Sequence, residues 1–300
     1  MSAPRDVDSE NPSPSSASPD AEAGAGAGPR PLAEPAPTGD ARLDALAKLL
    51  AIVDRLREPD GCPWDREQTV ASMGSSLTEE AFEALEAIDH ADDAGTAEEL
   101  GDLLMVIALI ARIAGEAGRF DIATIAETVS EKLVRRHPHV FGDAQVDGTE
   151  VVLQNWERIK KAEREDKAED ASALAGVPVA LPALQRADRI GAKAIAAGFR
   201  WSDTGGALAK LTEEVGELTA ELEAEEPDRA RLESELGDVL VAAAFLGRYL
   251  KIDPEAAARD AVRRFERRFR SMETEIPGSL AERPLDELVA AWQRAKERTG

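Results

Sequence analysis

The chain of 300 residues contains one cysteine and three histidines, and aromatic residues make up only 4% of it. The single thiol, Cys62, cannot form an intramolecular disulfide or a thiolate metal cluster within one chain. Scarce aromatic side chains beside abundant Ala, Leu and Glu favour helices over sheets. The composition therefore predicts an all-α protein.

Long hydrophobic runs are also missing. No apolar stretch reaches the roughly 18 residues that a membrane span needs, and the first residues have no segment typical of a signal peptide. The 36 basic residues are outnumbered by 59 acidic ones, which gives a formal net charge of -23. Such a charge disfavours binding to nucleic acid or to an anionic membrane. We therefore expect a soluble, cytoplasmic protein whose polyanionic ligands need metal ions or a few basic side chains.

The chain has a tail, two helical regions and a linker. Residues 1–40 hold eight of the 17 prolines and almost no large apolar residue, which predicts a disordered tail. Helical periodicity begins near Leu43 and is interrupted by an expected loop, "REPDGCPWD". Loss of periodicity predicts a linker at 166–183, between domains at 41–165 and 184–300. Further helices are expected around 77–91, 97–117, 121–136, 149–165, 184–198, 205–225, 228–250, 254–275 and 284–298.

The two helical regions carry the same motifs in the same order. "LTEEAFEAL" at 77–85 matches "LTEEVGELT" at 211–219, and "ELGD" at 99–102 recurs at 235–238. "EKLVRRHP" and "NWERIKKAE" correspond in the same way to "RRFERRFR" and "AWQRAKERT". Repetition at a nearly constant offset indicates a tandem duplication of one helical bundle domain.

Acidic residues in these motifs are spaced to converge. Residues three apart lie on one helix face, which pairs Glu214 with Glu217 and Glu235 with Asp238 on consecutive helices. An antiparallel helix pair would bring the four carboxylates together, where their repulsion is costly without a cation. All-oxygen ligands favour Mg²⁺, with Mn²⁺ as an alternative, over zinc. The first repeat offers Glu80, Glu83, Glu99 and Asp102 at the same spacing.

Two other interpretations compete for these acids. Glu-rich helices are commonly solvated faces, but the doubled pattern beside an apolar run in both repeats favours metal binding. A di-iron four-helix bundle normally uses Glu-x-x-His pairs. None of His90, His137 and His139 has a glutamate three residues before it, which disfavours that type of centre.

Basic and aromatic residues also recur at helical spacing. A Trp one turn from a Lys could stack on a base while the Lys contacts phosphate. Each such pair alone also fits a packed Trp beside a surface Lys, but repetition in both regions favours a nucleotide phosphate site. The pairs that share a helix face are Lys132 with Arg136, Arg264 with Arg268, Trp156 with Lys160, and Trp292 with Lys296.

The motifs "GCPWDREQT", "LTEEAFEALEAI", "ELGDLL" and "KLVRRHPHVF", with "GFRW", "EEVGE", "ELGD" and "FERRFR" in the second repeat, closely resemble the MazG nucleoside triphosphate pyrophosphohydrolases. The resemblance covers about 43–165 and 184–298. It implies an all-α bundle that dimerises and hydrolyses NTP to NMP and pyrophosphate with Mg²⁺. It also implies that the EExxE and ExxD carboxylates named above bind the metal. A housecleaning role in the nucleotide pool is an expectation from the resemblance alone.

No Ser, Cys or His nucleophile is required for this reaction, so we expect direct attack of water on the α-phosphorus. Glu217 is expected to act at the metal, and either Glu213 or Glu214 could serve as general base. The alternatives are a nucleotide-binding or regulatory helical module without turnover, and a structural scaffold, which leaves the paired carboxylates unexplained.

The two repeats differ in their cations. Lys210 and Arg231 stand one turn before Glu214 and Glu235, where they could reach bound phosphates, whereas Ser76 and Gly95 occupy the matching positions of the first repeat. Against this, the first repeat has Lys132 where the second has Arg264, and the two residue types differ at a phosphate. The second repeat is therefore expected to be the main catalytic unit.

A homodimer is expected as well. The run "LLMVIALIARI" at 103–113 has apolar residues on more than one helix face, and a single helix pair cannot cover them all.

Overall fold

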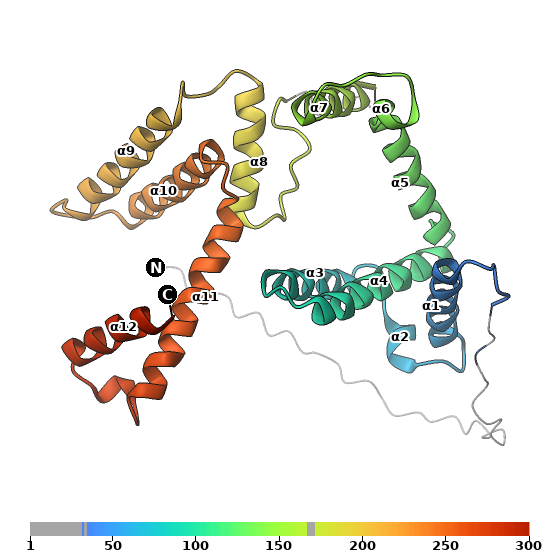
Figure 1. Ribbon diagram of the computed structural model, residues 1–300, viewed down its shortest axis with the longest axis horizontal. Coiled ribbons are helices and arrows are strands. Elements are labelled where there is room, and N and C mark those ends of the chain that lie inside the picture. Colours follow the sequence, from blue (N-terminus) through green and yellow to red (C-terminus); the bar gives the residue numbers. More distant parts are fainter. Residues whose placement is uncertain (1–31, 33–34, 167–171, 300) are drawn as a thin grey trace, which may run out of the picture. The chain divides into compact units, whose positions relative to one another are not determined.

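The computed structural model of the chain describes residue 32 and residues 35–166 and 172–299. Within these residues the regular secondary structure is helical, as the composition predicts. The chain divides into two compact units between Asp147 and Gly148 (Figure 1). Most of the predicted tail, and residues 167–171 of the predicted linker, lie outside the described residues.

The first unit is built around one long helix pair. α3 and α4 lie side by side, and α1 and α5 each pack against α4. Val53, Met73, Val106 and Leu109 are at most 2% exposed and form its core, where burial of each side chain contributes roughly 1.5–3 kcal/mol. The helices are α1 (Ala41–Arg57), α2 (Pro63–Glu67), α3 (Met73–Asp89), α4 (Asp93–Glu116), α5 (Ile122–Arg136) and α6 (Pro138–Phe141).

The second unit contains a corresponding pair, α9 and α10, with α8 packed against α10. Gly191 of α8 permits this approach, because a Cβ there would lie 2.9 Å from Cδ1 of Phe245 on α10. A smaller core around Met272 and Ala291 joins α11 to α12. The elements are α7 (Thr149–Asp166), α8 (Ala183–Ala196), α9 (Thr204–Leu222), α10 (Arg229–Tyr249), α11 (Pro254–Glu275), the 3-10 helix η1 (Leu280–Glu282) and α12 (Leu285–Thr299).

Aspartates begin several of these helices. At each one a carboxylate oxygen accepts a hydrogen bond from a backbone N–H in the first turn, which otherwise has no partner within the helix. A cap of this kind typically contributes about 1 kcal/mol, so part of the acidic composition serves helix boundaries. The caps are Asp40, Asp92, Asp121, Asp203, Asp228 and Asp253.

The structure departs from the sequence predictions in short elements. The loop expected at 57–65 contains the start of α2, and α6 follows α5 directly; both begin with proline, which suits the first position of a helix. The division at Asp147 places α7 in the second unit, whereas the repeat pattern assigns 149–165 to the first domain. The predicted boundaries at 165 and 183 stay predictions.

Many large apolar side chains of the long helix pairs face outward. On α9 and α10, Leu208 is 52% exposed, and Leu236 and Leu240 are each 50% exposed. In the part of the chain that the structure describes, no helix combines the length and apolarity that crossing a bilayer requires.

Candidate functional site

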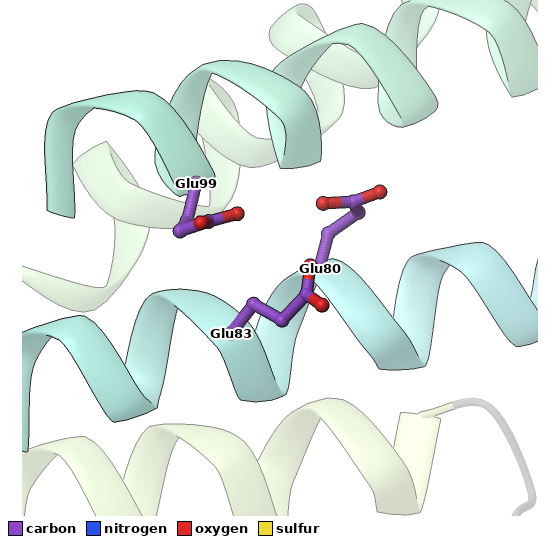
Figure 2. Close-up of side chains that lie close together, drawn as sticks. All are labelled: Glu80, Glu83 and Glu99. Carbon is purple, nitrogen blue, oxygen red and sulfur yellow. The ribbon is translucent and has the colours of Figure 1, made fainter. Parts of the chain in front are cut away.

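Three carboxylates converge in each unit. Glu80 and Glu83 of α3 meet Glu99 of α4, and we call these residues the N-terminal triad. Their oxygens lie within 4.8 Å of one another. Figure 2 shows the three side chains turned into the space between the two helices.

The second unit repeats this arrangement. Glu214 and Glu217 of α9 meet Glu235 of α10, again with oxygens within 4.8 Å of one another, and we call these residues the C-terminal triad. The spacing explains both triads, because residues three apart on one helix share the face that the partner helix covers. The sequence therefore predicted which glutamates the structure brings together.

The fourth acid of each motif is placed differently. Asp102 and Asp238 follow Glu99 and Glu235 by one helical turn and are exposed, and neither belongs to its triad. The charge of Asp102 helps to raise the pKa of Glu80, so Asp102 lies near the N-terminal triad. Whether either aspartate binds a metal stays a prediction.

Repulsion among neighbouring carboxylates contributes to the raised pKa values of Glu80 and Glu99 in the N-terminal triad. Partial removal from water raises the pKa of Glu80, and the charges of Asp102, Glu83 and Glu99 raise it further. Desolvation, then the charges of Glu83, Glu98 and Asp102, raises the pKa of Glu99. Both effects disfavour the ionised form. A cation among these oxygens would relieve the repulsion.

In the C-terminal triad, one glutamate has a raised pKa for the same reasons. Desolvation raises the pKa of Glu217, with further contributions from Glu214 and Glu235. Carboxylate oxygens clustered in this way are the donors that a hard divalent cation prefers. The residues present thus fit a hard divalent cation in chemistry, and each triad consists of glutamates alone.

Lys210 supplies a cation inside the second unit. Its Nζ lies 2.7 Å from Oε1 of Glu214 and 2.9 Å from Oε1 of Glu213. Glu214 is only 7% exposed, and the two carboxylates hold the pKa of Lys210 well above its usual range. One acid of the C-terminal triad is therefore already paired, whereas Ser76 at the matching position of the first unit carries no charge.

Arg231 contacts a carboxylate that the sequence reasoning missed. Its Nε lies 3.0 Å from Oε2 of Glu221, a residue on α9 that is 6% exposed. Oε1 of Glu221 also accepts a hydrogen bond from the backbone N–H of Asp228 at 2.9 Å. The signal for Glu221 was present in the sequence, since it stands one turn after Glu217 on the same face.

The remaining predicted cations of the second repeat lie on α11 and α12. Arg264 forms an ion pair with Asp260, one turn earlier on α11, and Arg268 follows one turn later. The ring centroids of Trp292 and Phe265 are 5.0 Å apart, and Trp292 packs against the core of Met272 and Ala291. Trp292 is thus a packed residue of this core, and nucleotide contacts by Trp292 and Lys296 stay a prediction.

The corresponding residues of the first repeat fall on two helices. Lys132 and Arg136 lie on α5, while Trp156 and Lys160 lie on α7. Nζ of Lys160 is 5.0 Å from the centroid of the Trp156 ring, a cation–π contact. Because α7 belongs to the second unit, a joint phosphate site of these four residues stays a prediction.

One known protein family matches the chain twice. The family model described as the MazG nucleotide pyrophosphohydrolase domain matches residues 68–141 and 205–272, so both triads fall inside the matched segments. The repeat that the motifs predict is thereby confirmed.

Several relatives match more than four fifths of the chain. A protein of Escherichia coli strain K12 named nucleoside triphosphate pyrophosphohydrolase is 40% identical over 260 residues, which is 85% of this chain and 98% of the relative. A Thermotoga maritima protein named nucleoside triphosphate pyrophosphohydrolase/pyrophosphatase MazG is 41% identical over 252 residues, 83% of this chain and 94% of the relative. An uncharacterised Bacillus subtilis protein is 41% identical over 250 residues, 82% of this chain and 50% of that protein.

Proposed function

The chain belongs to the MazG nucleotide pyrophosphohydrolase family, and on that premise we propose that it hydrolyses nucleoside triphosphates, ribo- or deoxyribo-, to NMP and pyrophosphate. The observation that carries the proposal is the pair of carboxylate triads, one in each matched segment. Relatives named nucleoside triphosphate pyrophosphohydrolase, which match more than four fifths of the chain, support the choice of substrate class.

We propose Mg²⁺ as the physiological cofactor, with Mn²⁺ as a substitute. Glu214, Glu217 and Glu235 would hold it in the second unit, with Asp238 one turn away, and the N-terminal triad with Asp102 offers the equivalent set. When bound, such a cation neutralises charge on phosphate oxygens and on the leaving pyrophosphate, and it lowers the pKa of water. The chain itself supplies only oxygen donors here, which suits a hard cation.

The chain's own residues would orient the substrate and accept the proton. A water oxygen forms a bond to the α-phosphorus while the bond from that phosphorus to the bridging oxygen of the β-phosphate breaks, so pyrophosphate departs with the electron pair. The water proton passes to a carboxylate, for which Glu213 and Glu214 are the candidates. Lys210 now contacts Oε1 of each of them, and we expect it to turn to the phosphates when a substrate binds.

The test is a product analysis. Purified chain is incubated with a panel of NTPs and dNTPs plus Mg²⁺, and NMP with pyrophosphate is the expected result. Removal of the metal by a chelator should stop turnover, and added Mn²⁺ should restore it. Formation of NDP and phosphate, or no NMP from any substrate, would refute the proposal.

A regulatory role is a second candidate for the first unit alone. Ser76 and Gly95 replace the two cations of the second unit, while the N-terminal triad is kept. Such a unit could bind metal and nucleotide without efficient turnover, as the alternative of a binding module predicts. Tight nucleotide binding that survives loss of the triad carboxylates, without hydrolysis, would favour the binding module for the whole chain.

We also propose that the chain acts as a homodimer. Leu208, Leu236 and Leu240 on the long pair of the second unit are each at least half exposed, and burying such side chains favours association. Light scattering at micromolar concentration should give twice the chain mass. A monomer under these conditions would contradict this proposal without affecting the assignment of the reaction.

A further inference from the structure

We propose that Glu221 is a positioning residue of the second unit: it holds the Arg231 guanidinium beside the turn between α9 and α10 and so keeps this cation off Glu235. The inference rests on the proposed function, because it concerns how Glu235 stays available to a metal. Glu221 itself is not proposed to bind metal or substrate.

Glu221 continues the charged row of α9. Lys210, Glu214, Glu217 and Glu221 follow one another at intervals of four, three and four residues, so they lie along one helix face. The ion pair between Glu221 and Arg231 of α10 shows that this face is turned toward α10 at the turn. Glu221 therefore ends the row on the side opposite Lys210.

Both oxygens of Glu221 are engaged. Oε1 accepts from the backbone N–H of Asp228, the cap of α10, at 2.9 Å, and Oε2 pairs with Nε of Arg231 at 3.0 Å. At 6% exposure this carboxylate is costly to leave without partners, and solvent screens its attraction for Arg231 only partly. The ion pair fixes the guanidinium end of the Arg231 side chain, which is 68% exposed.

Arg231 has a second carboxylate within reach on its own helix. Glu235 stands four residues later, the spacing at which oppositely charged side chains pair on a helix. Arg231 on Glu235 would occupy a carboxylate of the C-terminal triad and place a positive charge where the metal is proposed to bind. The observed pairing with Glu221 avoids this competition.

The first unit lacks both members of the pair. Ala87 and Gly95 occupy the positions of Glu221 and Arg231, and the backbone N–H of Asp92 donates instead to the carbonyl oxygen of Ala87 at 3.0 Å. A Cβ at Gly95 would lie 2.8 Å from Oδ2 of Asp92, the cap of α4. The short turn of the first unit thus needs no hydrogen bond from a side chain of α3. A residue equivalent to Glu221 is absent in the unit that has no arginine for it to hold.

The experiment measures binding of Mn²⁺ alone by calorimetry to the full chain carrying Glu83→Gln, which weakens the N-terminal triad. In this background Glu221→Gln keeps an amide oxygen that can accept from Asp228 but removes the charge that holds Arg231. We expect Mn²⁺ affinity to fall about threefold or more, since a cation beside the metal is repulsive. Glu233→Gln is the matched control, because it removes an exposed charge that pairs with Arg229 on the same helix.

The diagnostic step is a double-mutant cycle. Adding Arg231→Ala to Glu221→Gln should restore the Mn²⁺ affinity to within about twofold, whereas Arg231→Ala alone should change it by less than about twofold. A simple loss of negative charge, or damage to the turn, would not give this non-additivity. Circular dichroism checks that each variant keeps its helical content.

The outcomes separate this inference from the proposed function. Absence of Mn²⁺ binding in the chain with native Glu221 would count against the metal site itself. Binding that Glu221→Gln does not weaken, or weakening that Arg231→Ala does not reverse, overturns the role of Glu221. Should Glu221→Gln fail to fold, Arg231→Ala alone still decides: unchanged affinity supports the inference, and tighter binding by threefold or more shows that Arg231 already acts on Glu235 and overturns it.

Discussion

The two carboxylate triads have the same side chains and different surroundings. The C-terminal triad has Lys210 against Glu214 at one end and the pair of Arg231 and Glu221 near the other. At the N-terminal triad, Ser76, Gly95 and Ala87 take those positions. The carboxylate pattern was thus retained after duplication, while the charges that would meet a triphosphate differ. The difference is expected to appear in substrate binding and turnover more than in metal binding.

The largest expected effect comes from removing one triad at a time. Glu217→Ala should lower NMP formation about 100-fold or more, since loss of a residue that merely supports a metal ligand already costs roughly 10–100-fold. Glu217 also belongs to the unit that has Lys210 and Arg231 beside its triad. Glu83→Ala should lower NMP formation much less. Steady-state rates with saturating Mg²⁺ measure both, and circular dichroism confirms that both variants fold. A dead Glu83 variant beside an active Glu217 variant would assign catalysis to the first unit.

Exchanging the residues at positions 210 and 76 should show whether the lysine accounts for the difference in turnover between the units. Lys210→Ser removes the side chain that we expect to turn from Glu214 to the phosphates, so KM for the NTP should rise about tenfold, the usual worth of a hydrogen bond to a charged group. Lys48→Ser on α1 removes the same charge at an exposed position and serves as the control.

The reverse exchange tests the first unit. In a Glu217→Ala background, Ser76→Lys places an ammonium one turn before Glu80, as Lys210 stands before Glu214, and should raise the residual rate severalfold. Gly95 is a poorer site for a second cation, because a side chain there would meet the cap Asp92. No gain from Ser76→Lys would mean that the missing lysine does not explain the weaker unit.

The helices and triads were predictable because each follows from local spacing. Apolar periodicity marked the long helices, and the i, i+3 spacing of Glu80 and Glu83 fixed their common face. The partner of Arg231 was not predictable in this way. Two carboxylates, Glu221 and Glu235, lie within its reach, and the choice depends on the length of the turn between α9 and α10, which decides where the chain returns. The short helices α2 and α6 were not predicted either, because four or five residues carry too little periodicity to detect.

The smallest expected effect concerns stability without metal, and it has opposite signs in the two units. The raised pKa of Glu80 means that the folded state binds more protons than the unfolded state between the two pKa values, so its stability falls as pH rises through that window. At pH 7, with a chelator present, Glu80→Gln removes this repulsion and should raise Tm, and the gain should shrink as pH falls through the raised pKa of Glu80, where the carboxylate takes up its proton. Glu214→Gln should instead lower Tm at pH 7, because it leaves Lys210 without its buried partner at 2.7 Å. The ion pair of Lys210 stabilises the fold at this pH, since that stabilisation is lost only above the usual pKa of a lysine.

Glu67→Gln, at an exposed position of α2, is the control for loss of one charge. Thermal unfolding followed by circular dichroism measures all three variants, and a lower Tm for Glu80→Gln would show that the N-terminal triad is already neutralised without a metal.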